Sequence, residues 1–578
     1  MRIMCCLVLL SAAASAQTPP AWVAKSNENA QLLINIDAKY APESAASDGV
    51  TGLDEQISVP DEIHSRQGRA EMRTVIKELQ TRLISEKDSA VKQDLEILIG
   101  AANRRVRSSE AYEKYFLPYG NPGSTIFFGM KSLLDDQIAP ERRPAALVRL
   151  RKYTGMTPGF TPFTILLEDR FRGKLATTGL LGPSKLEVEK DLGNTSAYVN
   201  GIGLLLEKYK IQGYEEAFAK LKEQLAGYDE FVRREVRPKS RSDFRLPPEI
   251  YQIQLERYGV DYTPAELIRL AHQSFTEIQS QMRDVAVRVA KSRGLASNDY
   301  RSVIAELKKE QLEGNDILPH YRARLAEIEE IVRKNHLVAL PDRPALIIIA
   351  SAAETAQQPA PHMNPAPLLN NHGERGTFVL PLETTGNGGN TLKYDDFTFA
   401  AASWTLTAHE ARPGHELQFD AMIEHGVSLA RALFAFNSTN AEGWGLYSEW
   451  FMLPYMPDDG KLISLQLRLL RAARAFLDPE LQQGKITPDQ AMQVLERDVV
   501  CSKAFATEEV ERFTFRSPGQ AVSYFDGMTR LLEIRHATEK AMGSRFDVGK
   551  FHDFILSQGL LPPALLRKAV MEDFVGVR

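Results

Sequence analysis

The chain has 578 residues, of which 43% are hydrophobic and 25% are charged, and its formal net charge is −5. This length and apolar content can bury one large core or two ordinary ones. The slight negative charge and the dispersed Lys and Arg residues argue against a nucleic-acid partner, because polyanion binding needs a basic patch or stripe.

The first 16 residues have the three-part pattern of a secretory signal peptide. Arg2 precedes an apolar run at residues 3–10, and small residues close the segment at residues 14–16. The alternative is a mildly apolar N-terminus without a targeting role. We expect a cleavable signal peptide over residues 1–16, and therefore a mature protein that is periplasmic or secreted.

The three cysteines bear on this expectation. Cys5 and Cys6 would leave with the signal peptide, and they stand too early in it to serve as a lipoprotein anchor. Cys501 would then be single, so an exported protein would depend on core packing and not on an internal disulfide. No later segment approaches about 18 uninterrupted apolar residues, so we expect no stable membrane insertion.

Residues 17–67 are rich in Ala, Ser, Asp and Pro, and we expect them to form a loosely structured lead-in. Residues 68–330 are predicted to form an N-terminal helical region, which starts with a heavily charged helical pattern at 69–116. A later helix is marked by a capping box at residues 263–266 and by apolar residues at three- and four-residue spacing after it. His272 is one place from this apolar stripe, so we interpret it as a core or boundary residue and not as a ligand.

Residues 331–578 are predicted to form a second region, and this region opens with strand patterns. Two short runs, 346–349 and 377–380, are β-branched or aromatic and are bounded by Pro and Gly. A small sheet here could pair with an extended peptide through an edge strand, or it could be a structural hairpin without that role. Loop-like segments at 359–376 and 385–390 could border a cleft. Elsewhere long helices joined by short polar turns predict a mainly α fold.

Residues 409–415, His-Glu-Ala-Arg-Pro-Gly-His, supply two imidazoles and a carboxylate beside the first. The usual helical zinc motif has its histidines at i and i+4, whereas the second histidine here falls at i+6, roughly 240° around an ideal helix. Pro413 has no N–H for the carbonyl of His409, and Gly414 permits an unusual backbone angle. We expect one widened turn that brings His415 back under His409.

Glu442, 27 positions after His415, is the third candidate ligand. Polar cap-forming residues at 437–440 place it in the first turn of a new helix. Glu449 lies about two turns further on the same face, so it could orient a ligating histidine from behind. Two imidazoles and a carboxylate, with an open position for water, make up the ligand set of a catalytic zinc site. Residues 331–578 are therefore predicted to be the zinc-binding catalytic region. A buried structural histidine pair is the alternative.

At these residues the chain resembles the bacterial DUF885 family, which belongs with the zinc metallopeptidases of the gluzincin type. The family patterns H-E-x-x-P-G-H and E-G-W-x-L-Y-x-E are intact at 409–415 and 442–449. Further similar segments follow in order: R-A-A-R at 471–474, E-V-E-R-F at 509–513, P-G-Q-A-V-S-Y at 518–524, and an F-H-D segment with its Gly and Pro at 551–562. After Asp478, where many relatives have a histidine, this chain reads Pro-Glu-Leu-Gln, so no role of that histidine carries over.

The resemblance implies a large helical metallopeptidase-like fold, with a small β-sheet preceding the metal-binding helix, and a gluzincin mechanism. Zn2+ would be held by His409, His415 and Glu442, and Glu410 would act as general base toward the attacking water. Tyr524 is the candidate donor to the developing oxyanion. A packed aromatic ring with a satisfied hydroxyl is the alternative for Tyr524.

Four further residues are candidates near the same motif. Gln520 is one turn before Tyr524 and could contact the substrate backbone. Arg512 and Arg516 could each capture the terminal carboxylate of a peptide, or each could be half of a surface ion pair. His552 could reach the cleft or could be a buried histidine bonded to its own turn, and both interpretations stay open.

The leading functional hypothesis is a secreted zinc peptidase that hydrolyses short peptides. A zinc hydrolase of non-peptide amides is the first alternative, because the same attack by water serves any carbonyl. A catalytically silent binding protein of the same fold is the second, and an intact Glu410 argues against it.

Overall fold

Most of the chain is helical, and several helices begin where the sequence supplies a capping side chain. Thr263 accepts a hydrogen bond from the N–H of Glu266 at the start of α11 (Pro264–Arg293), and Thr487 does so for Gln490 at the start of α19 (Pro488–Gln493). The computed structural model describes residues 20–385 and 391–576, so the predicted signal peptide lies outside the described residues. The predicted mainly α fold is confirmed.

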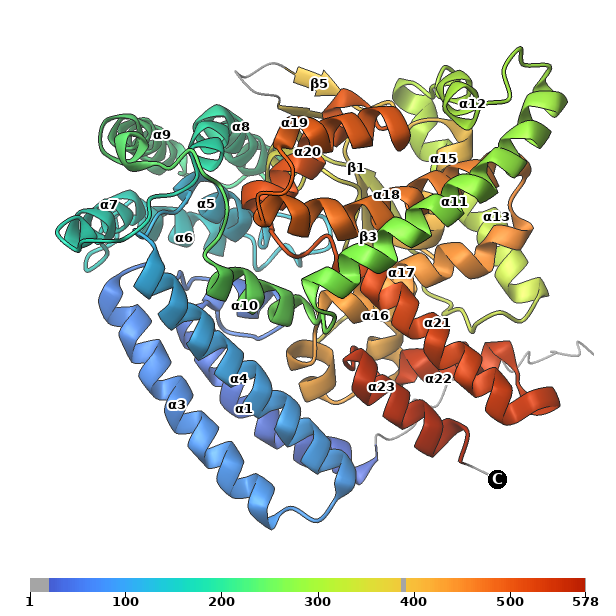
Figure 1. Cartoon of the computed structure of the whole chain (residues 1–578). Helices are drawn as coiled ribbons and strands as arrows, with labels where there is room; N and C mark the ends of the chain where they lie inside the picture. The colour runs from blue at the N-terminus through green and yellow to red at the C-terminus, as the bar shows by residue number, and fades with distance from the viewer. Residues whose placement is uncertain (1–19, 386–390, 577–578) are drawn as a thin grey trace, which may run out of the picture.

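Three long helices form an N-terminal bundle, drawn in blue in Figure 1: α1 (Ala21–Tyr40), α3 (Glu62–Ser85) and α4 (Ser89–Tyr115), with the short α2 (Pro42–Ser47) after α1. The predicted loosely structured lead-in over residues 17–67 is therefore wrong for α1 and α2. Composition misled the prediction, because the few large apolar residues of α1, such as Leu33 and Ile34, are buried in one core with α3 and α4.

A second group of helices has an apolar core of its own, which includes Phe127, Tyr153 and Phe171. The group consists of α5 (Pro122–Lys131), α6 (Ala145–Tyr153), α7 (Phe163–Lys174), α8 (Lys185–Lys208) and α9 (Glu215–Phe231). The chain then passes through α10 (Pro248–Tyr258), which contacts α4.

The two predicted strands pair with each other in a small sheet. β1 (Leu346–Ile349) runs parallel to β3 (Thr377–Leu380), and β2 (His362–Asn364) pairs antiparallel with the other side of β3. A separate hairpin joins β4 (Glu383–Thr385) to β5 (Thr391–Lys393). The small sheet before the helix of His409 is thus confirmed. The predicted loop at 359–376 contains β2, Thr385 ends β4, and residues 386–390 lie outside the described residues.

The remaining helices build the region around the sheet. They are α12 (Tyr300–Leu307), α13 (Ile317–Lys334), α14 (Ala352–Gln357), α15 (Ala400–Glu410), α16 (His415–His425), α17 (Ser438–Met452), α18 (Asp458–Gln482), α20 (Lys503–Glu511), α21 (Ser523–Met542), α22 (Val548–Ser557) and α23 (Pro563–Ala569). Two wide helical turns adjoin these helices: η5 (Ala430–Phe434) precedes α17, and η8 (Arg512–Arg516) continues α20.

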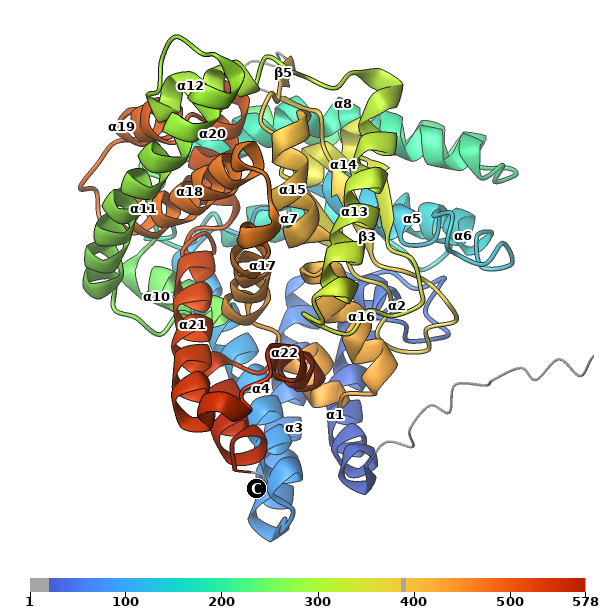
Figure 2. The same ribbon diagram turned by 90° about the vertical axis from the view of Figure 1, so that its right-hand side faces the viewer.

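Two pairs of helices pack side by side in this region: α11 packs along α18, and α17 packs along α21 (Figure 2). The two large apolar cores each combine residues from before and after residue 330, so the predicted regions 68–330 and 331–578 share their cores. Among the described residues, no helix combines the length and the apolar character of a bilayer-spanning segment.

Candidate metal centre

The first metal motif lies at a break between two helices. α15 ends at Glu410 and α16 begins at His415, so the predicted single widened turn is wrong, and the chain instead makes a short turn between two separate helices. A Cβ on Gly414 would lie 1.9 Å from the carbonyl oxygen of His409. Because φ of Gly414 is −79°, this close approach, and not a left-handed backbone, requires glycine.

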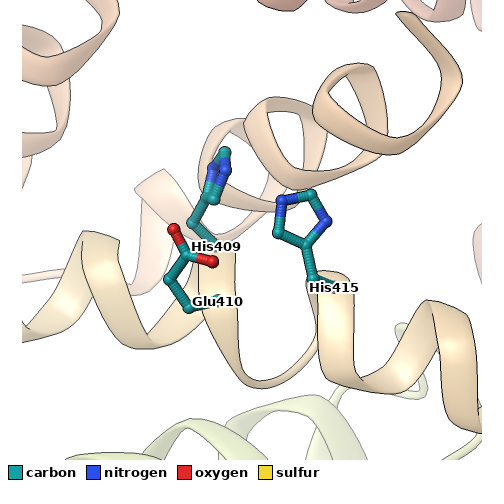
Figure 3. Close-up of side chains that lie close together, drawn as sticks. All are labelled: His409, Glu410 and His415. Atoms are coloured by element: carbon teal, nitrogen blue, oxygen red, sulfur yellow. The ribbon is translucent and has the colours of Figure 1, made fainter. Parts of the chain in front are cut away.

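The helix break brings the two imidazoles together (Figure 3). Their ring centroids are 4.7 Å apart, and their planes are nearly perpendicular at 86°. One ring nitrogen of His409, one of His415 and one carboxylate oxygen of Glu410 all lie within 4.8 Å of one another. The Nε2 atoms of His409 and His415 lie 3.4 and 3.2 Å from the same oxygen, Oε2, of Glu442. The structure thus brings together the three predicted ligands and the predicted base.

These separations fit a tetrahedral metal ion. Bonds of about 2.0–2.2 Å to such an ion place neighbouring ligand atoms roughly 3.3–3.6 Å apart. The distances from the Glu442 oxygen to the two ring nitrogens, 3.4 and 3.2 Å, are close to that range. Two imidazoles with one carboxylate are also a known ligand set of catalytic zinc. Both the spacing and the chemistry of the donor set therefore suit zinc.

Glu449 supports His409 from behind, where the sequence predicts it. Its Oε1 lies 2.7 Å from Nδ1 of His409, and its Oε2 accepts a hydrogen bond from the hydroxyl of Thr405 at 2.5 Å. Burial alone would raise the pKa of Glu449, but the Arg471 guanidinium, 3.4 Å away, and these hydrogen bonds hold that pKa below its usual value. The ionised carboxylate accepts the Nδ1 proton and so leaves Nε2 facing Glu442.

The centre is rich in negative charge. Burial alone would lower the pKa of His409, but the carboxylates of Glu410, Glu442 and Glu449 raise that pKa to about 9. Burial alone would raise the pKa of Glu442, but its hydrogen bonds with the two imidazoles hold the value well below the usual range. Burial raises the pKa of Glu410. Three carboxylates around two imidazoles form an environment that favours a divalent cation.

α17 carries Glu442 and fastens the turn between α15 and α16. The Asn437 side chain caps the helix by accepting from the N–H of Asn440 at 2.7 Å, as predicted. The helix begins at Ser438, so Glu442 lies just after its first turn and not within it.

Two neighbours of Glu442 on α17 contact the metal motif directly. The indole N–H of Trp444 donates to the carbonyl oxygen of Pro413 at 2.9 Å. A Cβ on Gly445 would lie 2.6 Å from Cε1 of His409, so the imidazole occupies the space that a side chain at 445 would need.

Tyr524 lies beside His409 at the start of α21. Its ring stacks on the imidazole with centroids 6.2 Å apart and planes at 17°. The guanidinium carbons of Arg474 and Arg471 lie 4.6 and 5.8 Å from the Tyr524 ring centroid. Arg512 donates from Nη1 to the Tyr524 hydroxyl oxygen at 3.4 Å. Burial raises the pKa of Tyr524, so the hydroxyl keeps its proton and can donate it to a ligand.

The three predicted substrate contacts have different locations. Gln520 lies at the centre, with Nε2 3.3 Å from Oε1 of Glu442, so it helps to position this carboxylate. Arg512 also lies there and is paired with Glu508 at 3.2 Å. Arg516 is at the far end of η8, where its Nε lies 3.1 Å from Glu511. The structure therefore separates Arg516 from the group around Tyr524.

His552 is fully buried away from the metal ligands. Its Nδ1 lies 2.7 Å from the carbonyl oxygen of Leu337, and its Nε2 lies 2.8 Å from the hydroxyl of Tyr447. Of the two interpretations of His552, the structure supports the one in which it is a buried histidine with satisfied hydrogen bonds. Its partners, however, come from other segments of the chain and not from its own turn. His272 is half exposed and stacks on Phe476 with centroids 3.9 Å apart, as a boundary residue.

Sequence reasoning gave no role to three buried polar residues of α18. Arg471 contacts Glu449, and Arg474 donates from Nε to Oε2 of Glu509 at 2.7 Å. Asp478 accepts the N–H of Gly519 at 2.8 Å and so holds the turn before α21. The available signal was the presence of charged side chains on a helix whose other residues are apolar, since such charges are rarely buried unless they are paired.

The fold and this site define a mainly helical protein with a candidate metal centre of two histidines and a glutamate. A family model described as "Bacterial protein of unknown function (DUF885)" matches residues 42–570. The chain belongs to this family, so the family resemblance is confirmed, whereas its placement among the gluzincin peptidases stays a prediction. No curated protein matches the sequence.

Two solved structures share the fold. One, described as a putative lipoprotein of unknown function from Shewanella oneidensis, is 19% identical with a TM-score of 0.68, over 96% of this chain and 100% of that one. The other, described in the same way as a lipoprotein and from Colwellia psychrerythraea, is 18% identical with a TM-score of 0.73, over 96% of this chain and 99% of that one. At these identities the likeness concerns the fold alone.

Proposed function

We propose that this chain is a zinc-dependent peptidase that hydrolyses short peptides. The observation that supports this most is the convergence of His409, His415 and the Glu442 carboxylate beside Glu410. These three side chains would hold the zinc ion, which would supply a Lewis acid that lowers the pKa of a water molecule toward about 7.

The side chains of the centre divide the remaining work. Glu410 is not one of the three ligands, and its raised pKa suits a group that takes a proton from water and later delivers it to the leaving amine. The Tyr524 hydroxyl donates a hydrogen bond to the substrate oxygen that becomes negative, while Arg512 holds the hydroxyl in place. Glu449 keeps His409 in the tautomer that a ligand needs.

The first prediction separates metal binding from chemistry. Glu410→Gln should keep about one zinc per chain, because residue 410 is not a ligand, yet it should lose nearly all turnover, because an amide cannot accept the proton. His415→Ala should lose both. Zinc is measured on the purified proteins, and turnover is measured by mass spectrometry on a mixed peptide library.

Glu313→Gln, at an exposed position, is the matched control and should behave as wild type. Loss of zinc from Glu410→Gln, or near-normal turnover, would reject the assignment of base and ligands. Cleavage of simple amides with no peptide products would favour the amidase alternative.

We also infer that the protein is exported, from the signal-like pattern of residues 1–16. The two structural relatives are described as lipoproteins, which agrees with a location outside the cytoplasm. The second prediction is that N-terminal sequencing of the protein from the periplasm or medium finds a start close to Gln17. An intact Met1 in the cytoplasmic fraction would contradict it.

A further inference from the structure

A cavity of about 420 Å³ is lined in part by the second half of η8 and by the turn that follows it. Its walls come from α3, α4, α7, α8 and α10, whose places are labelled in Figure 1, and from the segment Thr514–Pro518. Aromatic residues on these walls include Phe116 and Phe515.

Three residues that line the cavity each carry a buried polar atom without a partner. Oγ of Ser184, Oε1 of Gln254 and Nη2 of Arg516 form no hydrogen bond within the described part of the chain. Ser184 and Gln254 are only 3% and 6% exposed. Leaving such groups unpaired is costly, so a ligand that completes their hydrogen bonds would be favoured. A ligand with acceptor oxygens and one N–H donor would complete the hydrogen bonds of these three atoms.

The charge of the cavity specifies the ligand further. Arg170, Arg241 and Arg257 line it, and among residues 20–385 and 391–576 no carboxylate oxygen lies within ion-pair distance of them. The nearest carboxylates that act on Arg170 are those of Glu113 and Glu62, at longer range. Arg241 is fixed by the backbone, since it donates to the carbonyl oxygens of Gly182 and Arg245 at 3.2 and 2.9 Å. Guanidinium groups without a carboxylate in direct contact favour an anion.

The acidic residues of the cavity leave this positive charge in place. Glu62 and Glu113 are paired with Lys174 and Arg69 at 3.1 and 2.6 Å. Burial, together with the nearby Asp191, raises the pKa of Glu187 to about 8, so this carboxyl is mostly neutral near pH 7.

A short segment of the chain contacts both the cavity and the metal centre. Pro518 lines the cavity, and Gln520, two residues later, touches the Glu442 carboxylate at 3.3 Å. Two residues span at most about 7 Å. At one end of η8 Arg512 reaches Tyr524, and at the other end Arg516 reaches the cavity. The two sites therefore lie at the two ends of one short stretch of chain, residues 512–520.

We propose that this cavity binds the C-terminal carboxylate of a peptide substrate, which rests on the proposed peptidase function. The carboxylate oxygens accept from Nη2 of Arg516 and the hydroxyl of Ser184, and the last amide N–H donates to Oε1 of Gln254. The side chain of the last residue packs against the aromatic walls. Inorganic phosphate shares the oxyanion chemistry, but it offers neither the amide N–H nor an apolar part.

The test uses the full-length, zinc-loaded Glu410→Gln protein, in which binding is measured by calorimetry without turnover. The probes are N-acetyl-glycyl-phenylalanine, its C-terminal amide and inorganic phosphate. We expect the free acid to bind at least about tenfold more tightly than the amide, and phosphate not to displace it. Equal affinities of acid and amide, or displacement by phosphate, would overturn the proposal.

Substitutions locate the binding site. Adding Arg516→Gln should weaken the acid about tenfold toward the affinity of the amide, and Ser184→Ala, which removes only a hydroxyl, should weaken it in the same direction. Arg283→Gln, at an exposed position on α11, is the matched control and should change nothing. Unchanged affinity in Arg516→Gln and Ser184→Ala would overturn the site. Acid-selective binding by a protein that cleaves no peptide would refute the peptidase function and leave the cavity assignment standing.

Discussion

At the residue scale, Tyr524 brings a hydroxyl group close to the candidate metal ligands, since its ring stacks on that of His409. Its oxygen accepts from Arg512 at 3.4 Å, so the hydroxyl proton remains available to another acceptor. The ring is held between His409 and the α18 arginines, so losing the hydroxyl should disturb the packing little.

The third prediction follows from this placement. Tyr524→Phe should lower kcat and kcat/KM together by about 10²–10³ with KM nearly constant, because the lost bond forms chiefly in the transition state. Steady-state kinetics on a cleaved library peptide measure this, and Tyr455→Phe at a partly exposed tyrosine is the control. A raised KM at unchanged kcat would instead make Tyr524 a binding contact, and no change in either would make it a packing residue.

The sequence could predict which residues gather at the candidate metal centre, because each is a chemically distinctive residue within a short motif. It could not predict Arg471 and Arg474, because their role depends on Glu449 and Glu509, which lie on other helices. His552 is the same kind of case, since its two partners, Leu337 and Tyr447, are far away along the chain.

At the element scale, the site depends on how closely α17 approaches α21. A Cβ on Gly527 would lie 1.9 Å from the carbonyl oxygen of Thr439, and a Cβ on Gly443 would lie 2.6 Å from the carbonyl carbon of Gly527. The two helices therefore touch backbone to backbone, which only glycine allows. α17 carries Glu442 and α21 carries Tyr524, so this contact sets the distance between the proposed ligand and the proposed oxyanion donor.

The fourth prediction is that Gly527→Ala separates these helices. We expect weaker zinc binding, lower turnover and a lower Tm, because the new methyl group has no space and backbone must move. Zinc affinity, library turnover and thermal unfolding measure the three effects. Gly193→Ala, in a helix where the added Cβ meets nothing within 4 Å, is the matched control and should stabilise slightly. Unaltered zinc affinity in Gly527→Ala would contradict the role of this contact.

The sequence predicted the starts of helices well where one capping side chain determines them, as before α11, α17 and α19. The helix break before His415 was foreseen only as a distortion, since the close approach of Gly414 to the previous turn is a property of the folded backbone. α1 was missed because its stability comes from packing on α3 and α4, which composition does not record.

At the scale of the whole molecule, buried His552 makes stability depend on pH. Burial lowers the pKa of His552 from its usual 6.5 to about 3. Between these values the unfolded chain binds a proton that the folded chain does not, so the contribution is fully present above pH 6.5 and is lost as the pH falls toward 3. The slope from one such group reaches about 1.4 kcal/mol per pH unit.

The fifth prediction compares wild type with His552→Gln in urea unfolding at a series of pH values. The variant should be less stable at pH 7.5, because the bonds to Leu337 and Tyr447 are disturbed, and the difference should shrink as the pH falls below about 6.5. Parallel stability curves over this range would show that His552 is not the titrating group.

The N-terminal bundle is joined to the metal region by a buried carboxylate. Asp94 of α4 accepts from Ser26 and Ser428 at 2.5 Å and from Arg431 at 2.8 Å, and Arg431 belongs to η5, which connects the helix of His415 to the helix of Glu442. Asp94 and Arg431 are 337 residues apart in the chain.

That separation has a consequence during synthesis. At about 5–20 residues per second, a ribosome takes roughly 20–70 s to proceed from one partner to the other. Throughout this time the apolar faces of α1 and α4 stay exposed, because the C-terminal helices that cover them have not been made. The candidate metal ligands, which lie in the last third of the chain, have not been made either. The nascent chain should therefore depend on holding chaperones, and a chain kept unfolded in this way suits transport through a membrane before it folds.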